Sequence, residues 1–274
     1  MIGYKEFLKE LNYNNDLVRI PRSYNKFMIT ESSKIIKTFD SDTLGTVSIV
    51  QDSDKTVMVD EEGNAHSEIF NDWTYQEPPF SLLPLGALLN GSKNILMIGL
   101  GLGNVYNLIS NLNDRDITSI EYDKNTAEIA KEMLGIPDHA LMVGCGSELI
   151  KTFPDNVFDC VILDAYDKSG IPEVFYKKDF WDEVKRVSTK NVVITVNYCD
   201  PYNEVFKEKF KELNDLILNT FEVTKTVAHA DNEYAQNIYH YFSKAPNEKI
   251  LNDFVIGEYN PVELNKQQDY ISYF

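Results

Sequence analysis

Hydrophobic and polar positions divide the chain into two regions with different periods. Between residues 33 and 68, turn-forming residues separate three stretches rich in β-branched residues: "KIIKTFDS", "LGTVSIVQD" and "KTVMVDEEG". These stretches predict a small antiparallel sheet. Ahead of it, "MIGYKEFLKELNYNN" mixes Lys and Glu into a short apolar pattern, which predicts an amphipathic surface helix and not a signal peptide.

From Asn94 onward, apolar strand-like segments alternate with helical ones. The strand segments are residues 94–101, 117–123, 140–145, 158–166 and 191–198. Such alternation predicts a mostly parallel sheet with helices on both faces. Two more strand-like segments, residues 222–230 and 237–244, predict a hairpin that places an antiparallel strand at one edge of the sheet.

The segment that joins the two regions reads "EPPFSLLPLGALLNGS". Its paired prolines predict the start of a helix, and Gly91 predicts its end. We therefore divide the chain into a small N-terminal β domain with its leading helix, residues 1–77, and a larger α/β domain, residues 78–274.

A glycine-rich loop, "IGLGLGNVYN", follows the first strand of the repeating region. Ligands of open α/β sheets bind beyond the carboxyl ends of the strands, and Gly99, Gly101 and Gly103 let a ligand approach the backbone there. Glu121 ends the second strand, 22 positions after Gly99, where a carboxylate can accept hydrogen bonds from ribose hydroxyls. These residues predict a nucleoside site.

The third strand of the repeat ends in "GCG", which adds Cys145 and Gly146 to the candidate nucleoside site. NAD and S-adenosylmethionine, or a relative of the latter, are the candidate ligands. Asn104 stands where the G-x-G-x-x-G fingerprint requires its last glycine, which disfavours NAD. The terminal hairpin also suits a methyltransferase-type sheet better than a dehydrogenase.

Two aspartates, Asp164 and Asp167, follow the apolar fourth strand in "VILDAYD". A carboxylate at the mouth of a buried strand is costly unless something uses it, so both are candidates for a site. The structural alternative is that one caps the following helix and the other is simply exposed.

Composition narrows the class of function. The formal net charge of −17 disfavours nucleic acid as a partner and weakly favours a cationic substrate. The three cysteines and four histidines show no metal-ligand spacing, so we predict no metal. No window is apolar enough for a membrane span, and we expect a soluble, cytoplasmic protein without a membrane partner.

Several of these motifs together resemble the spermidine synthase family, the polyamine aminopropyltransferases. The resemblance rests on the N-terminal β region, "WTYQEPPFSLLPL", the glycine loop, "EYD", "GCG", "DAYD" and "FYKKDFWDEVKRV". It implies a small N-terminal β domain followed by a class I S-adenosylmethionine methyltransferase-like (Rossmann-like) α/β sheet. It also implies transfer of an aminopropyl group from decarboxylated S-adenosylmethionine to an amine, which releases methylthioadenosine.

The resemblance also implies roles for individual residues. Gln76 and Glu121 are expected to hold the nucleoside, Tyr75 and Asp167 the amine acceptor, and Asp164 is expected to take the proton of the reacting nitrogen. Such a carboxylate can both hold the cation and accept its proton. For Tyr75 the alternative is packing between the two domains.

The sequence departs from the family pattern at several places. Leu102 stands where the family has an aspartate that binds the amino group of the donor's tail, and Cys145 stands where an acid is expected near the adenine. Near the C-terminus the family's Tyr-Pro-Ser-Gly is missing, and Tyr234 and Tyr239 are the candidates to replace it. We therefore identify the chain as a divergent spermidine synthase-like member, in which the donor is S-adenosylmethionine or its decarboxylated form.

Three alternatives stay open at this stage. A small-molecule methyltransferase on the same fold is motivated by Leu102, and a non-catalytic nucleoside-binding relative by Leu102 and Cys145 together. An NAD dehydrogenase is the most distant. We also expect a homodimer, because a β-rich N-terminal region has open edges that a second copy can cover.

Overall fold

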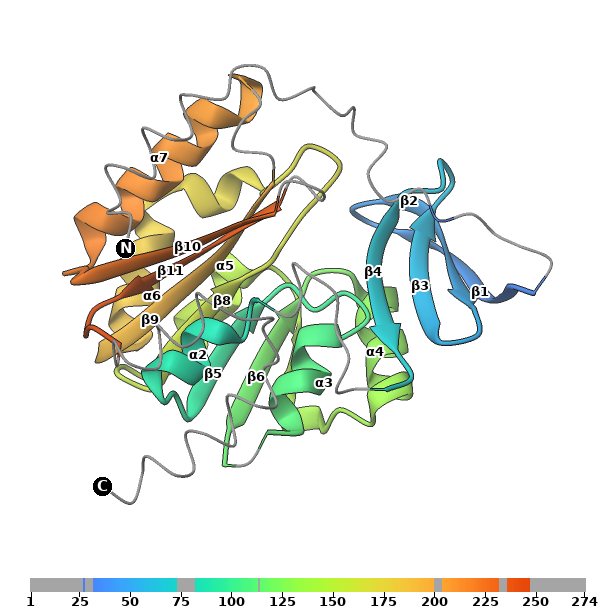
Figure 1. Cartoon of the computed structure of the whole chain (residues 1–274), viewed down its shortest axis with the longest axis horizontal. Helices are drawn as coiled ribbons and strands as arrows, with labels where there is room; N and C mark the ends of the chain where they lie inside the picture. The colour runs from blue at the N-terminus through green and yellow to red at the C-terminus, as the bar shows by residue number, and fades with distance from the viewer. Residues whose placement is uncertain are drawn as a thin grey trace.

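The predicted N-terminal sheet is present and has four strands. The computed structural model describes residue 27 and residues 32–72, 82–112, 114–199, 204–231 and 236–246. Strands β1 (Lys34–Ser41), β2 (Gly45–Gln51), β3 (Lys55–Asp60) and β4 (Ala65–Phe70) pair in chain order as an antiparallel meander, seen in blue in Figure 1. Residues 65–70 were not predicted as a separate strand.

Alternation along these strands gives the small sheet two apolar faces. Val57 and Val59 of β3 pack with Val50 on one face, while Met58 points to the other. On that second face Met58 meets Leu102 and other residues of the larger domain. Because successive strand residues point to opposite faces, one strand both completes the small sheet and docks it onto the larger domain.

The larger domain contains a seven-stranded sheet with the order β10-β11-β9-β8-β5-β6-β7. Its strands are β5 (Asn94–Ile98), β6 (Asp116–Glu121), β7 (Leu141–Val143), β8 (Phe158–Leu163), β9 (Ser188–Cys199), β10 (Lys225–Asp231) and β11 (Gln236–Phe242). The five strands from β5 to β9 run parallel, as the sequence predicted.

The predicted terminal hairpin is present, but the position of its antiparallel strand differs from the prediction. β11 is antiparallel to both of its neighbours, β9 and β10, and it lies inside the sheet. β10 forms the edge. The reason is in the strand patterns: "NIYHYF" is apolar on both faces, as an internal strand requires, and Ile238 to Phe242 are all buried.

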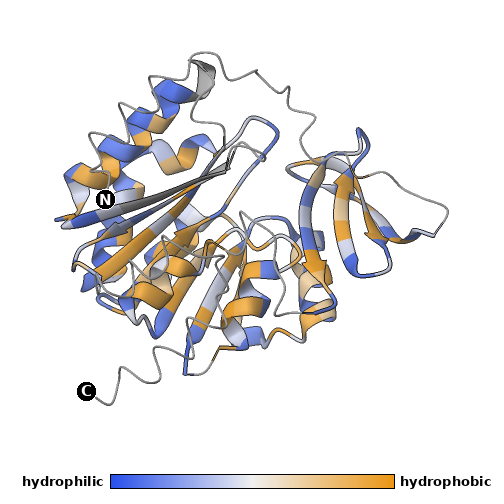
Figure 2. Cartoon of the chain, viewed as in Figure 1, coloured by the Kyte–Doolittle hydropathy of each residue, from blue (hydrophilic) through white to orange (hydrophobic). Residues whose placement is uncertain are grey.

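Helices cover both faces of this sheet. They are α2 (Leu85–Asn90), α3 (Asn104–Ser110), α4 (Lys124–Leu134), α5 (Gly146–Leu149), α6 (Lys178–Val187) and α7 (Glu204–Thr220), with 3₁₀ turns η1 (Asp138–Ala140), η2 (Ile150–Thr152) and η3 (Glu173–Tyr176). α2 and α3 pack on one face, and α6 and α7 on the other (Figure 1). Hydrophobic and hydrophilic residues alternate along α7 in Figure 2, as expected for a helix with one buried side.

Among the described residues, the largest fully buried side chain belongs to α6. Trp181 is 1% exposed, donates its indole N–H to the carbonyl oxygen of Phe175 at 2.9 Å, and packs edge-on against Phe180 and Phe221. An aromatic side chain of this size dominates the energetics of its core, and its single polar atom is satisfied. Trp181 therefore ties α6 to η3, in the segment after β8, and to Phe221 at the end of α7.

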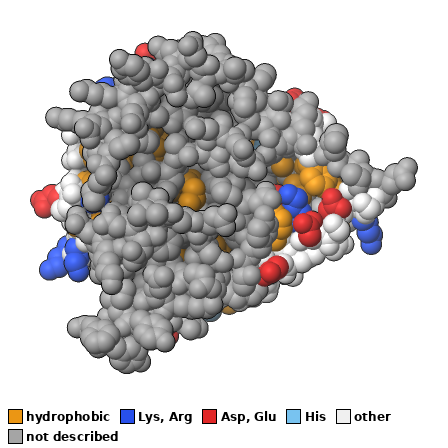
Figure 3. Space-filling model, in the orientation of Figure 1, with side chains coloured by type: hydrophobic (Ala, Val, Ile, Leu, Met, Phe, Trp, Pro, Cys, Tyr) orange, Lys and Arg blue, Asp and Glu red, His pale blue; other side chains and the backbone are white. Residues whose placement is uncertain are grey.

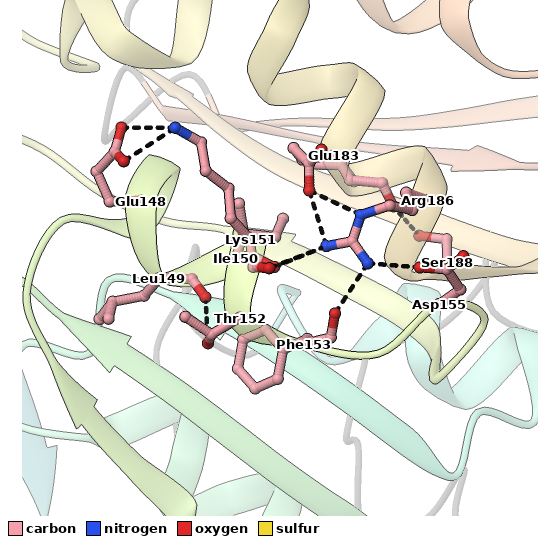
Figure 4. Close-up of polar contacts among 11 residues, drawn as sticks. Glu148, Leu149, Ile150, Lys151, Thr152, Phe153, Asp155, Glu183, Arg186 and Ser188 are labelled. Carbon is pink, nitrogen blue, oxygen red and sulfur yellow. Dashed lines mark hydrogen bonds and ion pairs between the residues drawn. The ribbon is translucent and has the colours of Figure 1, made fainter.

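Arg186, at the end of α6, fastens the loop that follows α5. Figure 4 shows its guanidinium between Glu183 and Asp155, with further bonds to the carbonyl oxygens of Phe153 (2.8 Å) and Ile150 (3.3 Å). A planar fork of donors suits this arrangement better than the single ammonium of lysine. The segment between α5 and β8 is thereby tied to α6, which packs on the same face of the sheet.

Two predicted features lie outside the described residues: the leading helix and the domain boundary at residues 77 and 78. The helix predicted in the joining segment is α2, which starts after Pro84 and ends at Gly91, whose φ of 67° is left-handed. No helix in the described part of the chain has the length and apolar character needed to cross a membrane.

Candidate nucleoside and amine site

The glycine loop lies between β5 and α3 and is held in a conformation that other residues rarely adopt. Gly99, Gly101 and Gly103 have φ angles of 91°, 55° and 86°. A Cβ added to Gly99 would lie 2.1 Å from the carbonyl oxygen of Asp164, and one added to Gly101 would lie 2.7 Å from Ser67 Oγ. Glycine at these two positions therefore lets the loop touch both β8 and the N-terminal sheet.

A cavity of about 750 Å³ opens beyond the carboxyl ends of β5, β6, β7 and β8. Part of its wall comes from the N-terminal sheet, through Asp42, Thr43, Leu44, Met58, His66 and Ser67. The rest comes from the strand ends and the loops after them, including Gly99, Gly101, Asn104, Glu121, Cys145, Gly146, Asp164, Asp167 and Asn197. Its position is that of ligand sites in open α/β sheets.

Glu121 lies in the cavity wall as predicted, and its carboxylate also holds the glycine loop. One oxygen accepts hydrogen bonds from the N–H groups of Leu100 (2.9 Å) and Gly101 (3.2 Å), and the other accepts from Asp123 (2.9 Å). Burial raises the pKa of Glu121 above its ordinary value, and these backbone donors oppose that shift. Glu121 therefore shapes the loop in addition to facing the cavity.

Asp164 follows β8 and is oriented by β9. Leu163 pairs with Val196 in the parallel register, which brings the next residues together, and Asn197 Nδ2 donates to Asp164 Oδ1 at 2.9 Å. Burial raises the pKa of Asp164 from 3.8 to about 6; the Asn197 bond lowers it and the nearby Glu121 charge raises it. A carboxyl with this pKa can accept a proton near neutral pH.

Asp167 also lines the cavity, but part of its bonding is local. Its Oδ1 accepts hydrogen bonds from the backbone N–H (2.7 Å) and the hydroxyl (2.6 Å) of Ser169. Backbone bonds between Asp167 and Gly170 close a tight turn. Lys168, at the tip of this turn, reaches the β1–β2 turn, where its Nζ lies near Gly45. Asp167 thus neither caps the following helix nor is simply exposed: it stabilises a tight turn and also lines the cavity.

Leu102 does not line the cavity. Its side chain is fully buried and packs with Leu44, Ile49 and Met58 of the N-terminal sheet, while its N–H donates to Ser67 Oγ at 2.9 Å. The apolar residue at this position thus helps to dock the two domains. Its presence is explained by packing, so Leu102 gives no reason by itself to prefer a methyltransferase.

The remaining predicted site residues fall into three groups. Cys145 and Gly146 line the cavity, and Cys145 Sγ lies 3.2 Å from Ser147 Oγ. Gly103 lies outside the cavity wall, because its Cα faces Leu134 of α4. Tyr75, Gln76 and Tyr234 lie outside the described residues.

One tyrosine considered at the sequence level is placed elsewhere. Tyr239 is 1% exposed and packs against Tyr198, Phe210 and Tyr241 in the core. It therefore does not replace the missing C-terminal motif, because it is an internal residue of the central sheet.

The sequence analysis missed Asn197 and Tyr166. Both line the cavity, and the Tyr166 hydroxyl donates to the carbonyl oxygen of Asn197. A signal was present for Asn197, since a polar side chain ends the apolar run "NVVITVNY" on the strand after Asp164. Within the described residues, no cluster of three or more His, Cys, Asp or Glu side chains is placed to hold a metal ion.

Comparisons of the sequence with known proteins identify its family. A family model described as the spermine/spermidine synthase domain matches residues 82–253. A curated polyamine aminopropyltransferase of Clostridioides difficile (strain 630) is 24% identical over 218 residues, 76% of this chain and 72% of that protein. Alignments with further curated polyamine aminopropyltransferases span about half of those proteins' length.

Solved structures share the fold. A probable spermidine synthase from Corynebacterium glutamicum ATCC 13032 superposes with a TM-score of 0.68 at 16% identity, covering 85% of this chain and 93% of that one. A spermidine synthase in complex with the transition state analogue AdoDATO gives a TM-score of 0.63 at 17% identity, with 85% and 84% covered. These similarities confirm the predicted fold class. Since the family model matches more than half of the chain, the protein belongs to the spermine/spermidine synthase family.

Proposed function

We propose that the protein transfers an aminopropyl-type group from S-adenosylmethionine, or from its decarboxylated form, to an amine acceptor, with methylthioadenosine as the second product. The observation that carries this proposal is Asp164: its carboxyl faces the cavity, is oriented by Asn197 and has a pKa of about 6. The relatives named polyamine aminopropyltransferases support transfer to an amine over the methyltransferase and dehydrogenase alternatives.

The charge of the cavity wall supports a cationic acceptor. Five carboxylates contribute to the wall: Asp42, Glu121, Asp123, Asp164 and Asp167. Lys168 and His66 are the basic side chains among the described residues that line it. Acidic side chains around a partly desolvated cleft attract a cation and raise its local concentration. Figure 3 shows acidic side chains beside apolar ones and a basic one on the face of the N-terminal sheet.

In the proposed reaction, Asp164 accepts a proton from the ammonium of the acceptor. The freed nitrogen lone pair then attacks the methylene carbon bonded to the sulfonium. The carbon–sulfur bond breaks with its electron pair going to sulfur, which yields methylthioadenosine. Because the sulfonium is already activated, most of the catalysis comes from placing nitrogen in line with sulfur. Glu121, Cys145 and Gly146 are the described residues proposed to face the nucleoside, and Asp167 the acceptor.

The test is a product assay with each donor and a panel of diamines and polyamines, read by mass spectrometry. Methylthioadenosine above the level without enzyme, lost in Asp164→Asn, supports the proposal. Asp182→Asn, which changes an exposed carboxylate of α6, is the matched control and should keep full activity. S-adenosylhomocysteine as the product would identify a methyltransferase instead, and the absence of any product together with nucleoside binding would identify a non-catalytic relative.

A homodimer and a cytoplasmic location stay predictions. In support of the homodimer, β1 is an edge strand, and its Ile35 and Ile36 side chains are each 52% exposed. An exposed edge with apolar side chains favours pairing with a second copy. Light scattering of the full chain measures the mass directly, and a monomer at micromolar concentration would contradict the homodimer.

A further inference from the structure

Asn104 is a buried amide in the cavity wall with both of its polar atoms unpartnered. It is 2% exposed, and neither Oδ1 nor Nδ2 has a hydrogen-bond partner among the described residues. It lines the cavity as the first residue of α3, next to the glycine loop. A buried amide without partners is rare in folded proteins, and each such group requires an explanation.

The amide lies on the part of the cavity where the glycine loop and the N-terminal sheet meet. The loop residue Gly101 touches Ser67 of β4, and both line the cavity together with Asn104. The nearby Leu102 side chain points into the core between the two domains, so it leaves this part of the wall to Asn104. Asn104 is therefore the residue with a polar side chain that the glycine loop and the start of α3 place at the cavity wall.

We infer that Asn104 binds the tail of the adenosyl donor, and that this tail carries both an ammonium and a carboxylate. This inference rests on the proposed function. A carboxamide has one acceptor, Oδ1, and one donor group, Nδ2. An ammonium alone satisfies the acceptor and leaves Nδ2 buried without a partner. An α-amino acid group satisfies both, because its ammonium donates to Oδ1 and its carboxylate accepts from Nδ2.

The donor named by this chemistry is S-adenosylmethionine that keeps its carboxylate. The group transferred to the acceptor nitrogen is then 3-amino-3-carboxypropyl. The bonds balance as before: nitrogen bonds to the methylene carbon, the carbon–sulfur electron pair goes to sulfur, and the ammonium proton goes to Asp164. A neutral amide suits a tail with no net charge, whereas a carboxylate at position 104 would repel the carboxylate of the tail.

Calorimetry with the full chain can measure how much each charged group of the tail contributes to binding, with three unreactive nucleosides as ligands. Methylthioadenosine has no tail, decarboxylated S-adenosylhomocysteine carries the ammonium, and S-adenosylhomocysteine carries the ammonium and the carboxylate. We expect S-adenosylhomocysteine to bind more tightly than both others. In Asn104→Leu its affinity should fall by about 10- to 100-fold, because hydrogen bonds to charged groups are lost, while the affinity for methylthioadenosine stays the same.

A second variant and a stability measurement separate binding from folding. Asn104→Asp keeps the shape of the side chain and should reverse the order, so that the decarboxylated compound binds more tightly than S-adenosylhomocysteine. Without ligand, the melting temperature of Asn104→Leu should be unchanged or higher, since an unpartnered polar group leaves a buried position. A structural role for Asn104 predicts a lower melting temperature instead.

Several outcomes overturn the inference. One is an equal loss of affinity for all three compounds in Asn104→Leu, which would place the amide against the nucleoside. Another is tighter binding of the decarboxylated compound by the unchanged protein. Both leave the proposed function intact, since they still show a nucleoside site. If methylthioadenosine itself does not bind the unchanged protein, the proposed function fails and the inference fails with it.

Discussion

Asn197 Nδ2 donates a hydrogen bond to Asp164 Oδ1 at 2.9 Å, across two neighbouring parallel strands. The bond favours the ionised carboxylate and opposes the burial that raises the pKa of Asp164 to about 6. Asn197→Leu should therefore raise the acid limb of the kcat/KM profile by about one pH unit and lower activity below pH 7. Tyr166→Phe is the control. It removes the hydroxyl that bonds the Asn197 carbonyl oxygen but leaves the Asn197–Asp164 bond in place, so the acid limb of the kcat/KM profile should stay near its original pH. An unmoved limb in Asn197→Leu would contradict this role.

Asp164 makes both activity and stability depend on pH. The proposed proton transfer requires the ionised carboxyl, so kcat/KM should fall about tenfold per pH unit below about 6. The folded state holds a proton that the unfolded state releases near pH 3.8, so stability falls as pH rises from 3.8 to about 6.

Asp164→Asn removes the pH-dependent contribution of Asp164 to the free energy of unfolding. Above pH 7 we expect the variant to be as stable as the original protein or more stable, by at most about 3 kcal/mol, while activity drops about 10²- to 10⁴-fold. Urea unfolding at pH 5 and pH 8 measures the first effect and the product assay measures the second. If Asp164→Asn is less stable than the original protein at pH 8, the prediction is wrong: contacts of the ionised carboxylate then outweigh the free-energy cost of burying its charge.

Gly99 lies against the backbone of Asp164, with an added Cβ only 2.1 Å from its carbonyl oxygen, and has a φ of 91°. Gly99→Ala should displace the catalytic strand end and abolish activity, with a loss of stability of about 3 kcal/mol or more. Gly91→Ala is the matched control, because Gly91 also has a positive φ, 67°, but has open space around its Cα. It should cost about 1 kcal/mol and leave activity unchanged. If the two substitutions destabilise the protein equally, the strain of a positive φ accounts for the loss, and the contact between the new Cβ and Asp164 does not.

Asp123 joins the two domains as well as capping a helix. Its carboxylate accepts from the N–H of Thr126 (2.8 Å) at the start of α4 and from the N–H of Asp42 (2.7 Å) in the β1–β2 turn. Burial tends to raise the pKa of Asp123, but these hydrogen bonds outweigh it and the pKa is lowered.

Asp123→Ala should lower the free energy of unfolding by about 2 kcal/mol, because it removes a helix cap and a charge-assisted hydrogen bond. Asp123→Asn keeps an oxygen that accepts from the N–H of Thr126, so its free energy of unfolding should fall by less than that of Asp123→Ala. The stabilisation comes from a lowered pKa, so it is present above pH 4 and disappears as pH falls below this value. Thermal unfolding at pH 7 and pH 3 tests this. The difference in stability between the original protein and Asp123→Ala should shrink at pH 3, and a larger difference at pH 3 would contradict the prediction.

The sequence predicted the parallel sheet because five apolar segments alternate with helical ones, and periodicity carries that information. It also placed Asp164 and Glu121 at the carboxyl ends of their strands, since strand ends can be located from polar residues after apolar runs. The position of β11 inside the sheet was not predictable in this way. Strand order depends on pairing across long sequence separations, here between residues 193–199 and 236–242.

The environment of Leu102 was also hidden from the sequence. Its neighbours Leu44 and Met58 lie more than forty residues away along the chain, in a different domain. The sequence of a glycine loop that contains a hydrophobic residue does not indicate whether that residue faces a ligand or a second domain. The unpartnered amide of Asn104 was likewise invisible, because hydrogen-bond satisfaction is a property of the folded chain.

The N-terminal sheet forms one wall of the cavity, while the proposed reacting groups stand on β6 and β8 of the other domain. The two parts of the chain thus both contribute to one site. Substitutions of cavity-lining side chains on β1–β4 can alter which molecules fit while Asp164 and Glu121 keep their places on the other sheet. Side chains on this front sheet are accordingly the positions at which the substrate range can be engineered while the proposed proton acceptor is kept.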